Sequence, residues 1–91
     1  ILAPTDPKLA YNLGLVYTRL GDGPKAEQNL RDAIALKPNY QEPYYALTLY
    51  LEQSKQLAKI PPILSQALTS LSTYSAQLKE KINKYTSDPA R

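Results

Sequence analysis

The chain has 91 residues, of which 43% are apolar, and its 11 basic and 8 acidic side chains leave a formal net charge of +3. This size and balance fit one soluble globular domain with a modest core. The lack of cysteine excludes a disulfide framework and a thiolate metal site, and no apolar run approaches the roughly 18 residues that a membrane span requires. We therefore expect no insertion into a membrane; we see no signal peptide, and the composition leaves the compartment open.

The first predicted helix has clear start and stop residues. Asp6 can cap a helix that begins at Pro7, because proline is favoured at the first helical position. Gly21 supplies a residue that readily adopts the left-handed conformation and ends the helix. These signals predict a helix over residues 7–20.

The second and third predicted helices have less complete start and stop signals. An Asp-Gly-Pro run at 22–24 starts a second helix, and a Lys-Pro pair at 37–38 ends it. Asn39 can cap a third helix, with Pro43 inside its first turn. Because the turn after that helix has no glycine and Pro61-Pro62 delay the start of the next helix, we expect the third helix to overrun into residues 56–58.

A fourth helix is predicted to start near the Pro61-Pro62 pair. Its apolar positions keep helical spacing for about 24 residues, which predicts one long C-terminal helix. The stripe consists of Leu64, Ala67, Leu68, Leu71, Tyr74, Leu78, Ile82 and Tyr85. We expect its later half, from about Thr73, to cover the exposed apolar face of the preceding helices, and residues 86–91 to fray.

Many of these residues recur at a spacing of 34, which we call the repeat period. The matches pair Leu2 with Leu36, Pro4 with Pro38, Tyr11 with Tyr45, Leu13 with Leu47, Leu15 with Leu49, Lys25 with Lys59, Leu30 with Leu64, Ala33 with Ala67 and Tyr40 with Tyr74. Most of the agreement is apolar, as a shared core requires. A fixed period of this length indicates stacked helical hairpins.

Residues 7–40 carry small and large packing residues at eight spaced positions, namely Ala10, Leu13, Gly14, Tyr17, Ala26, Leu30, Ala33 and Pro38. This pattern resembles the tetratricopeptide repeat (TPR), although Ala10 stands where the family has a large aromatic residue. Residues 41–74 form a weaker copy. There Tyr44 restores the aromatic residue, whereas Thr48, Ile60 and Ser72 replace a glycine, an alanine and a proline.

The resemblance implies an all-α fold, a right-handed stack of antiparallel helix hairpins with a long C-terminal capping helix. We expect residues 1–6 to end a preceding repeat and 7–40 to form the first TPR-like repeat. Residues 41–72 would be a degenerate second repeat, and 73–91 a C-terminal helix extension with a frayed tail. The chain would then be a piece of a longer protein.

The side chains available for chemistry are few. The chain has no His, Cys, Met or Trp, so it lacks the usual general base, the strongest nucleophile and the commonest transition-metal ligands. The acidic residues are scattered, without paired-carboxylate spacing. We therefore expect no enzyme activity and no cofactor, and we interpret Gly21-Asp22-Gly23 as a turn rather than a phosphate-binding loop.

Binding is the function that these residues favour. The outward faces of the first and third predicted helices carry Lys8, Tyr11, Asn12, Leu15, Arg19, Tyr45, Leu49 and Glu52. In a hairpin stack, Tyr11, Leu15, Tyr45 and Leu49 would form a ladder along the concave surface that TPR proteins use to hold extended peptides or partner helices. Tyrosine combines a large contact area with a polar group and is common in interface hot spots. We predict a protein or peptide partner there.

Other interpretations stay open. The ladder could serve packing alone, as we expect for Tyr17, Tyr44 and Tyr50. Some TPR proteins hold a C-terminal carboxylate between Lys and Asn side chains, and Lys8 and Asn12 match that pair, but the next repeat offers Ala46 instead of Asn.

Two other classes of function also remain. A homo-oligomer could form through exposed apolar ends or a swapped last helix. Nucleic acid is not expected, because Lys79, Lys81 and Lys84 have Glu80 among them and fit a solvated charged face better.

Overall fold

The structure is a computed structural model that describes residues 5–86, and those residues contain helices and no strands. The elements in chain order are α1 (Pro7–Leu20), α2 (Gly23–Leu36), α3 (Gln41–Gln53), a short 3-10 helix η1 (Leu57–Lys59), α4 (Ile60–Ser70) and α5 (Ala76–Tyr85). The all-α class predicted from the sequence is thereby confirmed. None of these helices has both the length and the apolar character needed to cross a bilayer.

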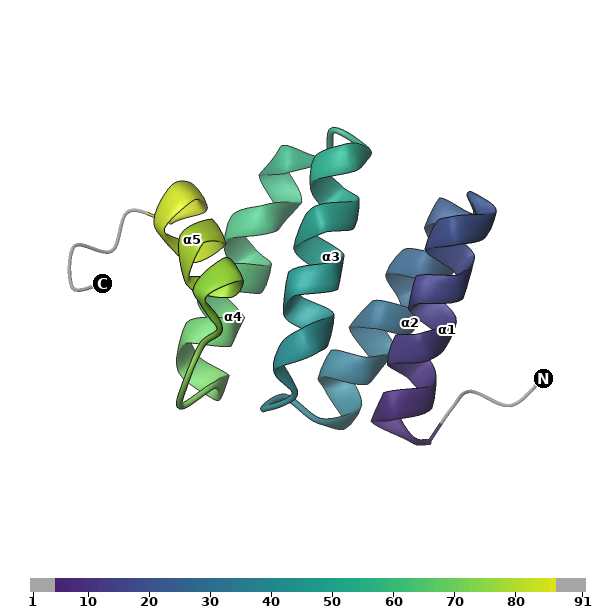
Figure 1. The fold of residues 1–91 in the computed structure, drawn as a ribbon, viewed down its shortest axis with the longest axis horizontal. Helices are drawn as coiled ribbons and strands as arrows, with labels where there is room; N and C mark the ends of the chain where they lie inside the picture. The colour runs from purple at the N-terminus through teal and green to yellow at the C-terminus, as the bar shows by residue number, and fades with distance from the viewer. Residues whose placement is uncertain (1–4, 87–91) are drawn as a thin grey trace.

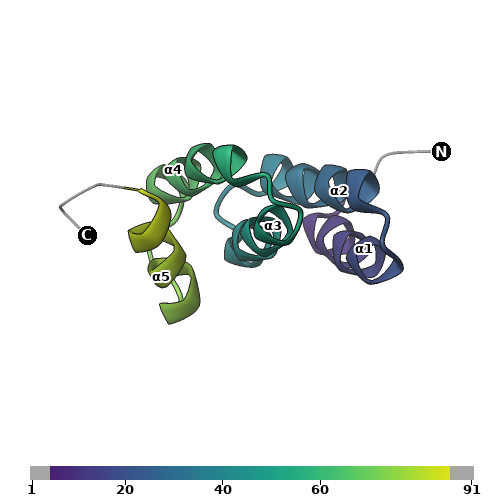
Figure 2. The same ribbon diagram turned by 90° about the horizontal axis from the view of Figure 1, so that it is seen from above.

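The helices are arranged in two layers, as Figures 1 and 2 show. Helices α2 and α4 form one layer, and α1, α3 and α5 form the other, with α5 inclined to its neighbours. Each helix contacts the next in the chain, and α3 also contacts both α1 and α5. The molecule is consequently elongated, with extents of 43 × 26 × 18 Å, and α3 lies at its centre.

The ends of α1 are formed as predicted. The Asp6 side chain accepts a hydrogen bond from the Lys8 amide at 2.9 Å, which satisfies one of the unpaired donors of the first turn. Gly21 has φ 80°, and the amides of Gly21 and Asp22 donate to the carbonyls of Thr18 and Tyr17. Asp22 caps α2 by accepting from the Lys25 amide at 3.3 Å.

The predicted overrun of the third helix is wrong. Helix α3 ends at Gln53, and Lys55 takes the left-handed conformation with φ 64°. The amides of Lys55 and Gln56 donate to the carbonyls of Glu52 and Leu51, the same pair of bonds that ends α1. Lys55 lies one repeat period after Gly21, so the second copy keeps the turn geometry without its glycine.

This turn generates the first prediction. Replacing Lys55 by glycine removes the clash of a Cβ atom in the left-handed conformation, so the free energy of unfolding should rise by about 1 kcal/mol. Urea denaturation followed by circular dichroism measures it. Lys55→Ala is the matched control because it removes the charge but keeps Cβ, and an equal gain in both variants would contradict the explanation.

The cap predicted for the third helix is also wrong. The N-cap residue of α3 is Tyr40 rather than Asn39, and no side chain caps the helix with a hydrogen bond. Pro43 does lie in the first turn, as expected, and is buried. Helix α4 begins at Ile60, one residue before the predicted proline pair.

The single long C-terminal helix is the largest error. Helix α4 ends at Ser70, Leu71 is extended with ψ 140°, and α5 begins only at Ala76. Ser75 caps α5 by accepting from the Leu78 amide at 3.1 Å, while its own amide donates to the side-chain carbonyl of Gln41 on α3. The predicted fraying concerns mostly residues 87–91, which lie outside the described residues.

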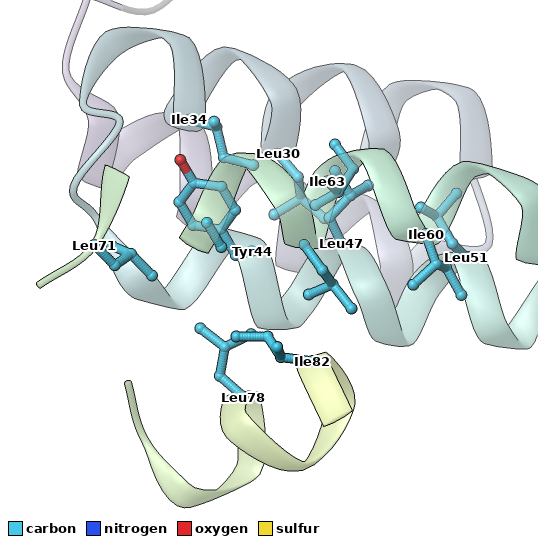
Figure 3. Packing of buried hydrophobic residues seen from close by; sticks show 12 residues of the cluster. Leu30, Ile34, Tyr44, Leu47, Leu51, Ile60, Ile63, Leu71, Leu78 and Ile82 are labelled. Atoms are coloured by element: carbon cyan, nitrogen blue, oxygen red, sulfur yellow. The ribbon is translucent and has the colours of Figure 1, made fainter. Parts of the chain in front are cut away.

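The core is centred on one side of α3 (Figure 3). Tyr44, Leu47 and Leu51 are fully buried there. Leu30 and Ile34 of α2, the apolar positions of α4 and two residues of α5, Leu78 and Ile82, complete the cluster. The segment after Thr73 therefore packs its apolar side on the preceding helices. The Tyr44 hydroxyl donates to the Pro38 carbonyl at 2.6 Å, so its burial leaves no unpaired polar atom.

Gly14 permits the close packing of α1 on α2. A Cβ atom at this position would lie 2.7 Å from both Cγ and Cδ2 of Leu30, far inside normal contact distance. Leu30 is fully buried, so it has little space to move.

Enlarging Gly14 should therefore separate the two helices. We expect Gly14→Leu to lower the free energy of unfolding by about 1–3 kcal/mol through overpacking. Chemical denaturation measures this loss. Asn12→Leu adds the same side chain at an exposed position of α1 and should change stability by less than about 0.5 kcal/mol. Equal effects of the two changes would contradict the packing argument.

Candidate binding surface

The layer formed by α1, α3 and α5 contains the residues predicted to bind a partner. Lys8, Asn12 and Arg19 on α1 are exposed. The other predicted residues are half-buried, namely Tyr11, Leu15, Tyr45, Leu49 and Glu52. Tyr11 and Tyr45 both pack against the core cluster, so each serves the fold as well as the surface.

At the α1 end of this layer, Tyr11 contacts a second tyrosine. Its ring meets the ring of Tyr40 edge to face, with centroids 5.6 Å apart and an interplanar angle of 66°. Burial raises the pKa of both phenols, and the nearby Glu42 carboxylate raises it further. Both hydroxyls therefore stay protonated near neutral pH and can donate hydrogen bonds to a partner.

At the other end, α5 covers part of the predicted site. The Glu52 carboxylate accepts hydrogen bonds from Lys81 Nζ at 2.9 and 3.0 Å and from the Tyr85 hydroxyl, and Lys84 Nζ lies 3.9 Å away. The phenol of Tyr45 lies near Lys81 and contributes to raising the pKa of that lysine. Glu52 therefore holds α5 against α3 in this structure, a role that the sequence did not predict.

These contacts change the titration of both ionic partners. Burial alone would raise the pKa of Glu52, but hydrogen bonds from Tyr85 and Lys81 and the charges of Lys81 and Lys84 outweigh it, and the pKa is lowered. The hydrogen bond with Glu52 raises the pKa of Lys81 against the opposing effect of burial. With side-chain exposures of 16% for Lys81 and 19% for Glu52, solvent screens this pair less than a surface pair.

The lowered pKa of Glu52 predicts a pH-dependent contribution to stability. A carboxylate with a lowered folded pKa stabilises fully above its ordinary pKa, and this stabilisation disappears as the pH falls through the folded value. Glu52→Gln should lower the free energy of unfolding by about 1–3 kcal/mol near pH 7. The wild type should then lose more stability than Glu52→Gln between about pH 6 and pH 3.

Urea denaturation at a series of pH values measures this difference. Glu80→Gln removes an exposed carboxylate of α5 and is the matched control, whose stability should follow the wild type across the range. Parallel pH profiles for wild type and Glu52→Gln would show that the Glu52 contacts do not hold α5.

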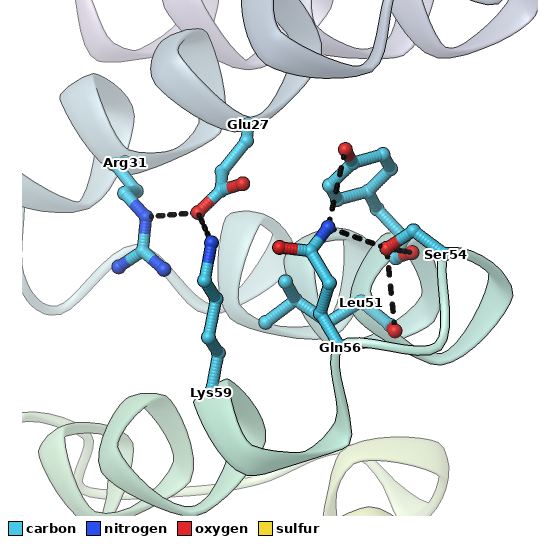
Figure 4. A network of polar contacts seen from close by, with 7 residues as sticks. Glu27, Arg31, Leu51, Ser54, Gln56 and Lys59 are labelled. Atoms are coloured by element: carbon cyan, nitrogen blue, oxygen red, sulfur yellow. Dashed lines mark hydrogen bonds and ion pairs between the residues drawn. The ribbon is translucent and has the colours of Figure 1, made fainter.

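The opposite face carries a separate polar network, shown in Figure 4. Glu27 of α2 binds Arg31 one turn away at 2.8 Å and Lys59 of η1 at 3.5 Å. Since Arg31 and Lys59 are more than a third exposed, these ion pairs contribute little to stability. They orient η1 on α2 and lie away from the predicted ladder.

Beside this face, Gln56 donates to Ser54 Oγ at 2.8 Å and to the Tyr50 hydroxyl at 3.5 Å, which orders the turn after α3. A polar recess lies between residues 37–42, where the chain enters α3, and the loop at 71–73. Within residues 5–86, no cluster of three or more His, Cys, Asp or Glu side chains could hold a metal ion.

The tyrosines predicted to serve packing differ in their surroundings. Tyr44 is fully buried, and Tyr50 is half-buried against the core cluster. Tyr17 is half-buried and lies beneath the Lys25 ammonium, 5.5 Å from the ring centroid. The residues that sequence reasoning missed are Lys81 and Tyr85, whose only signal is that they share one face of α5 at a spacing of four residues.

Comparison with known proteins adds no identification. No protein-family model, curated protein or solved structure matches this chain.

Proposed function

We propose that this chain is a TPR-like, non-catalytic interaction module that binds a peptide or helix of another protein on the face containing Tyr11, Leu15, Tyr45 and Leu49. The observation that carries the proposal is the position of these side chains. They occupy equivalent places, one repeat period apart, on α1 and α3, which contact each other, and all four are only half-buried.

The helix bounds support the TPR-like part of the proposal. Moving α2, Gly23–Leu36, forward by one repeat period gives 57–70, which is the combined extent of η1 and α4. The same shift in residue number brings the bounds of α1 onto those of α3 to within one residue. It brings the bounds of α3 onto a segment that contains α5. A period that holds for helix ends as well as for side chains is typical of a repeat architecture.

The distribution of exposed groups supports binding nearer to α1 than to α5. Lys81 and Tyr85 are engaged with Glu52, whereas Lys8, Asn12 and Arg19 are exposed beside Tyr11 and Leu15. Half-buried tyrosine flanked by exposed polar groups is typical of a hot spot with a polar rim. Glu52 then acts in positioning α5 at the end of this surface.

A partner bound there should depend on the ladder. We expect Tyr11→Ala with Tyr45→Ala to weaken binding of an isolated partner at least about 10-fold, since loss of a hot-spot side chain often costs about 2 kcal/mol. Affinity capture with the chain as bait, followed by calorimetry with the captured protein, measures this change. The matched control is Gln28→Ala with Gln66→Ala, two exposed positions on α2 and α4.

Because Tyr11 and Tyr45 also pack against the core, thermal unfolding must show that the double variant is folded. Lys8→Ala with Arg19→Ala changes only exposed α1 residues and provides a second variant independent of stability. Undiminished affinity in both variants would place the binding site elsewhere on the molecule.

The two other functions considered from the sequence have less support. For nucleic acid, Lys81 and Lys84 lie against Glu52, which reduces the positive charge that α5 offers to phosphate. For exchange of the last helix between copies, Leu78 and Ile82 are fully buried within their own chain, so exchange would require opening that core.

A further inference from the structure

The outer edge of α1 carries three of the five exposed large apolar side chains of residues 5–86. Leu9, Val16 and Leu20 are 49%, 45% and 72% exposed. Their spacings of seven and four residues place them along one side of the helix. Isolated exposed leucines are ordinary, but several on one helix side indicate a surface that another element covers.

Two of the three equivalent positions on α3 are covered, whereas the third, Ser54, is exposed. Leu9 and Val16 correspond, one repeat period later, to Pro43 and Tyr50. Pro43 is buried, and Tyr50 meets the start of α2 so closely that a Cβ atom at Gly23 would lie 2.6 Å from its hydroxyl. At Tyr50, the element that covers this edge is the preceding helix, α2.

Two further pairs of equivalent residues show the same difference. Leu47 and Leu51 of α3 have no exposed surface, and they lie in one cluster with Leu30 and Ile34 of α2 and with residues of α4 and α5 (Figure 3). Their equivalents on α1, Leu13 and Tyr17, are only half-buried. One helix position in the repeating arrangement is thus occupied beside α3 and unoccupied beside α1.

The opposite end of the layer differs in polarity. The exposed positions of α5 are mostly polar, including Gln77, Lys79 and Glu80, so this helix closes the stack with a surface suited to water. The apolar edge is therefore a property of the α1 end and not of every helix at an end.

We propose that the Leu9–Val16 edge is covered by an amphipathic helix of the same polypeptide that precedes Pro7 and lies against α1 as α2 lies against α3. Its apolar residues would have the spacing of Leu30 and Ile34. The residues ahead of α1 fit this register, since Leu2 and Pro4 match Leu36 and Pro38, although 1–4 lie outside the described residues. This proposal is independent of peptide binding on the Tyr11 face.

The test extends the full chain by a copy of its own α2 sequence. Residues 23–34 placed directly ahead of Ile1 continue the register of the repeat, so that the copy of Gly23 would lie beside Val16 and the copies of Leu30 and Ile34 would lie toward Leu13. We expect the extension to raise Tm by roughly 5–10 °C in a thermal unfolding experiment, the shift that covering this edge should produce in a chain of this size. Hydrogen exchange of the α1 amides should slow in parallel.

Two matched variants separate docking from a general effect of added residues. In the first, serine replaces the copied leucine and isoleucine, and the gain in Tm should vanish. In the second, Leu9→Ser with Val16→Ser should cancel the gain in the extended chain while leaving Tm of the original chain nearly unchanged.

Two outcomes would overturn the proposal. One is an equal Tm for the extended chain and its serine control, which would mean that the edge does not accept a helix in this place. The other is a concentration-dependent dimer of the original chain in sedimentation that Leu9→Ser with Val16→Ser abolishes, which would show that a second copy covers the edge. Neither outcome bears on the Tyr11 face, so the proposed function is tested separately.

Discussion

The burial of one side of α3 is the constraint on which the rest of this structure depends. Tyr44, Leu47 and Leu51 are enclosed by α2, α4 and α5 together, so no single hairpin could cover them. Removing a large apolar side chain from water contributes about 1.5–3 kcal/mol, and a chain of this length has few such side chains. Helix α5 is therefore part of the core, because Leu78 and Ile82 complete the enclosure.

The same packing shapes the proposed binding surface. Docking of α5 brings Lys81 and Tyr85 to Glu52, beside Tyr45, so the end of the ladder nearest α5 is partly occupied by the chain itself. The ion pair helps to hold α5 and sets its orientation, although desolvation of the two charges offsets part of their attraction. The proposed binding surface is therefore partly covered at the α5 end and exposed at the α1 end. This asymmetry follows from the position that α5 takes to complete the core.

The two main errors of sequence reasoning share a physical origin. Lys55 adopts a left-handed conformation that its residue type disfavours, because two backbone hydrogen bonds and the packing of α4 on α3 compensate for the local cost. The apolar stripe of residues 64–85 keeps helical spacing although the helix is broken at 71–75. Two helices joined by a short turn can carry apolar residues at the same spacing as one continuous helix, so this spacing alone does not reveal the break. The repeat period does locate both turns, through the match of Gly21 with Lys55 and of Tyr40 with Tyr74.

By itself, the sequence determined what depends on local chemistry and on periodicity. The caps at Asp6 and Asp22, the glycine that ends α1, the all-α class and the fully buried Tyr44 all follow from residue types and their spacing. Only the tertiary structure decided which polar groups meet across helices. Glu52 is 29 residues from Lys81 and 33 from Tyr85, and their contact depends on the angle at which α5 packs, which side-chain packing sets and no local signal encodes.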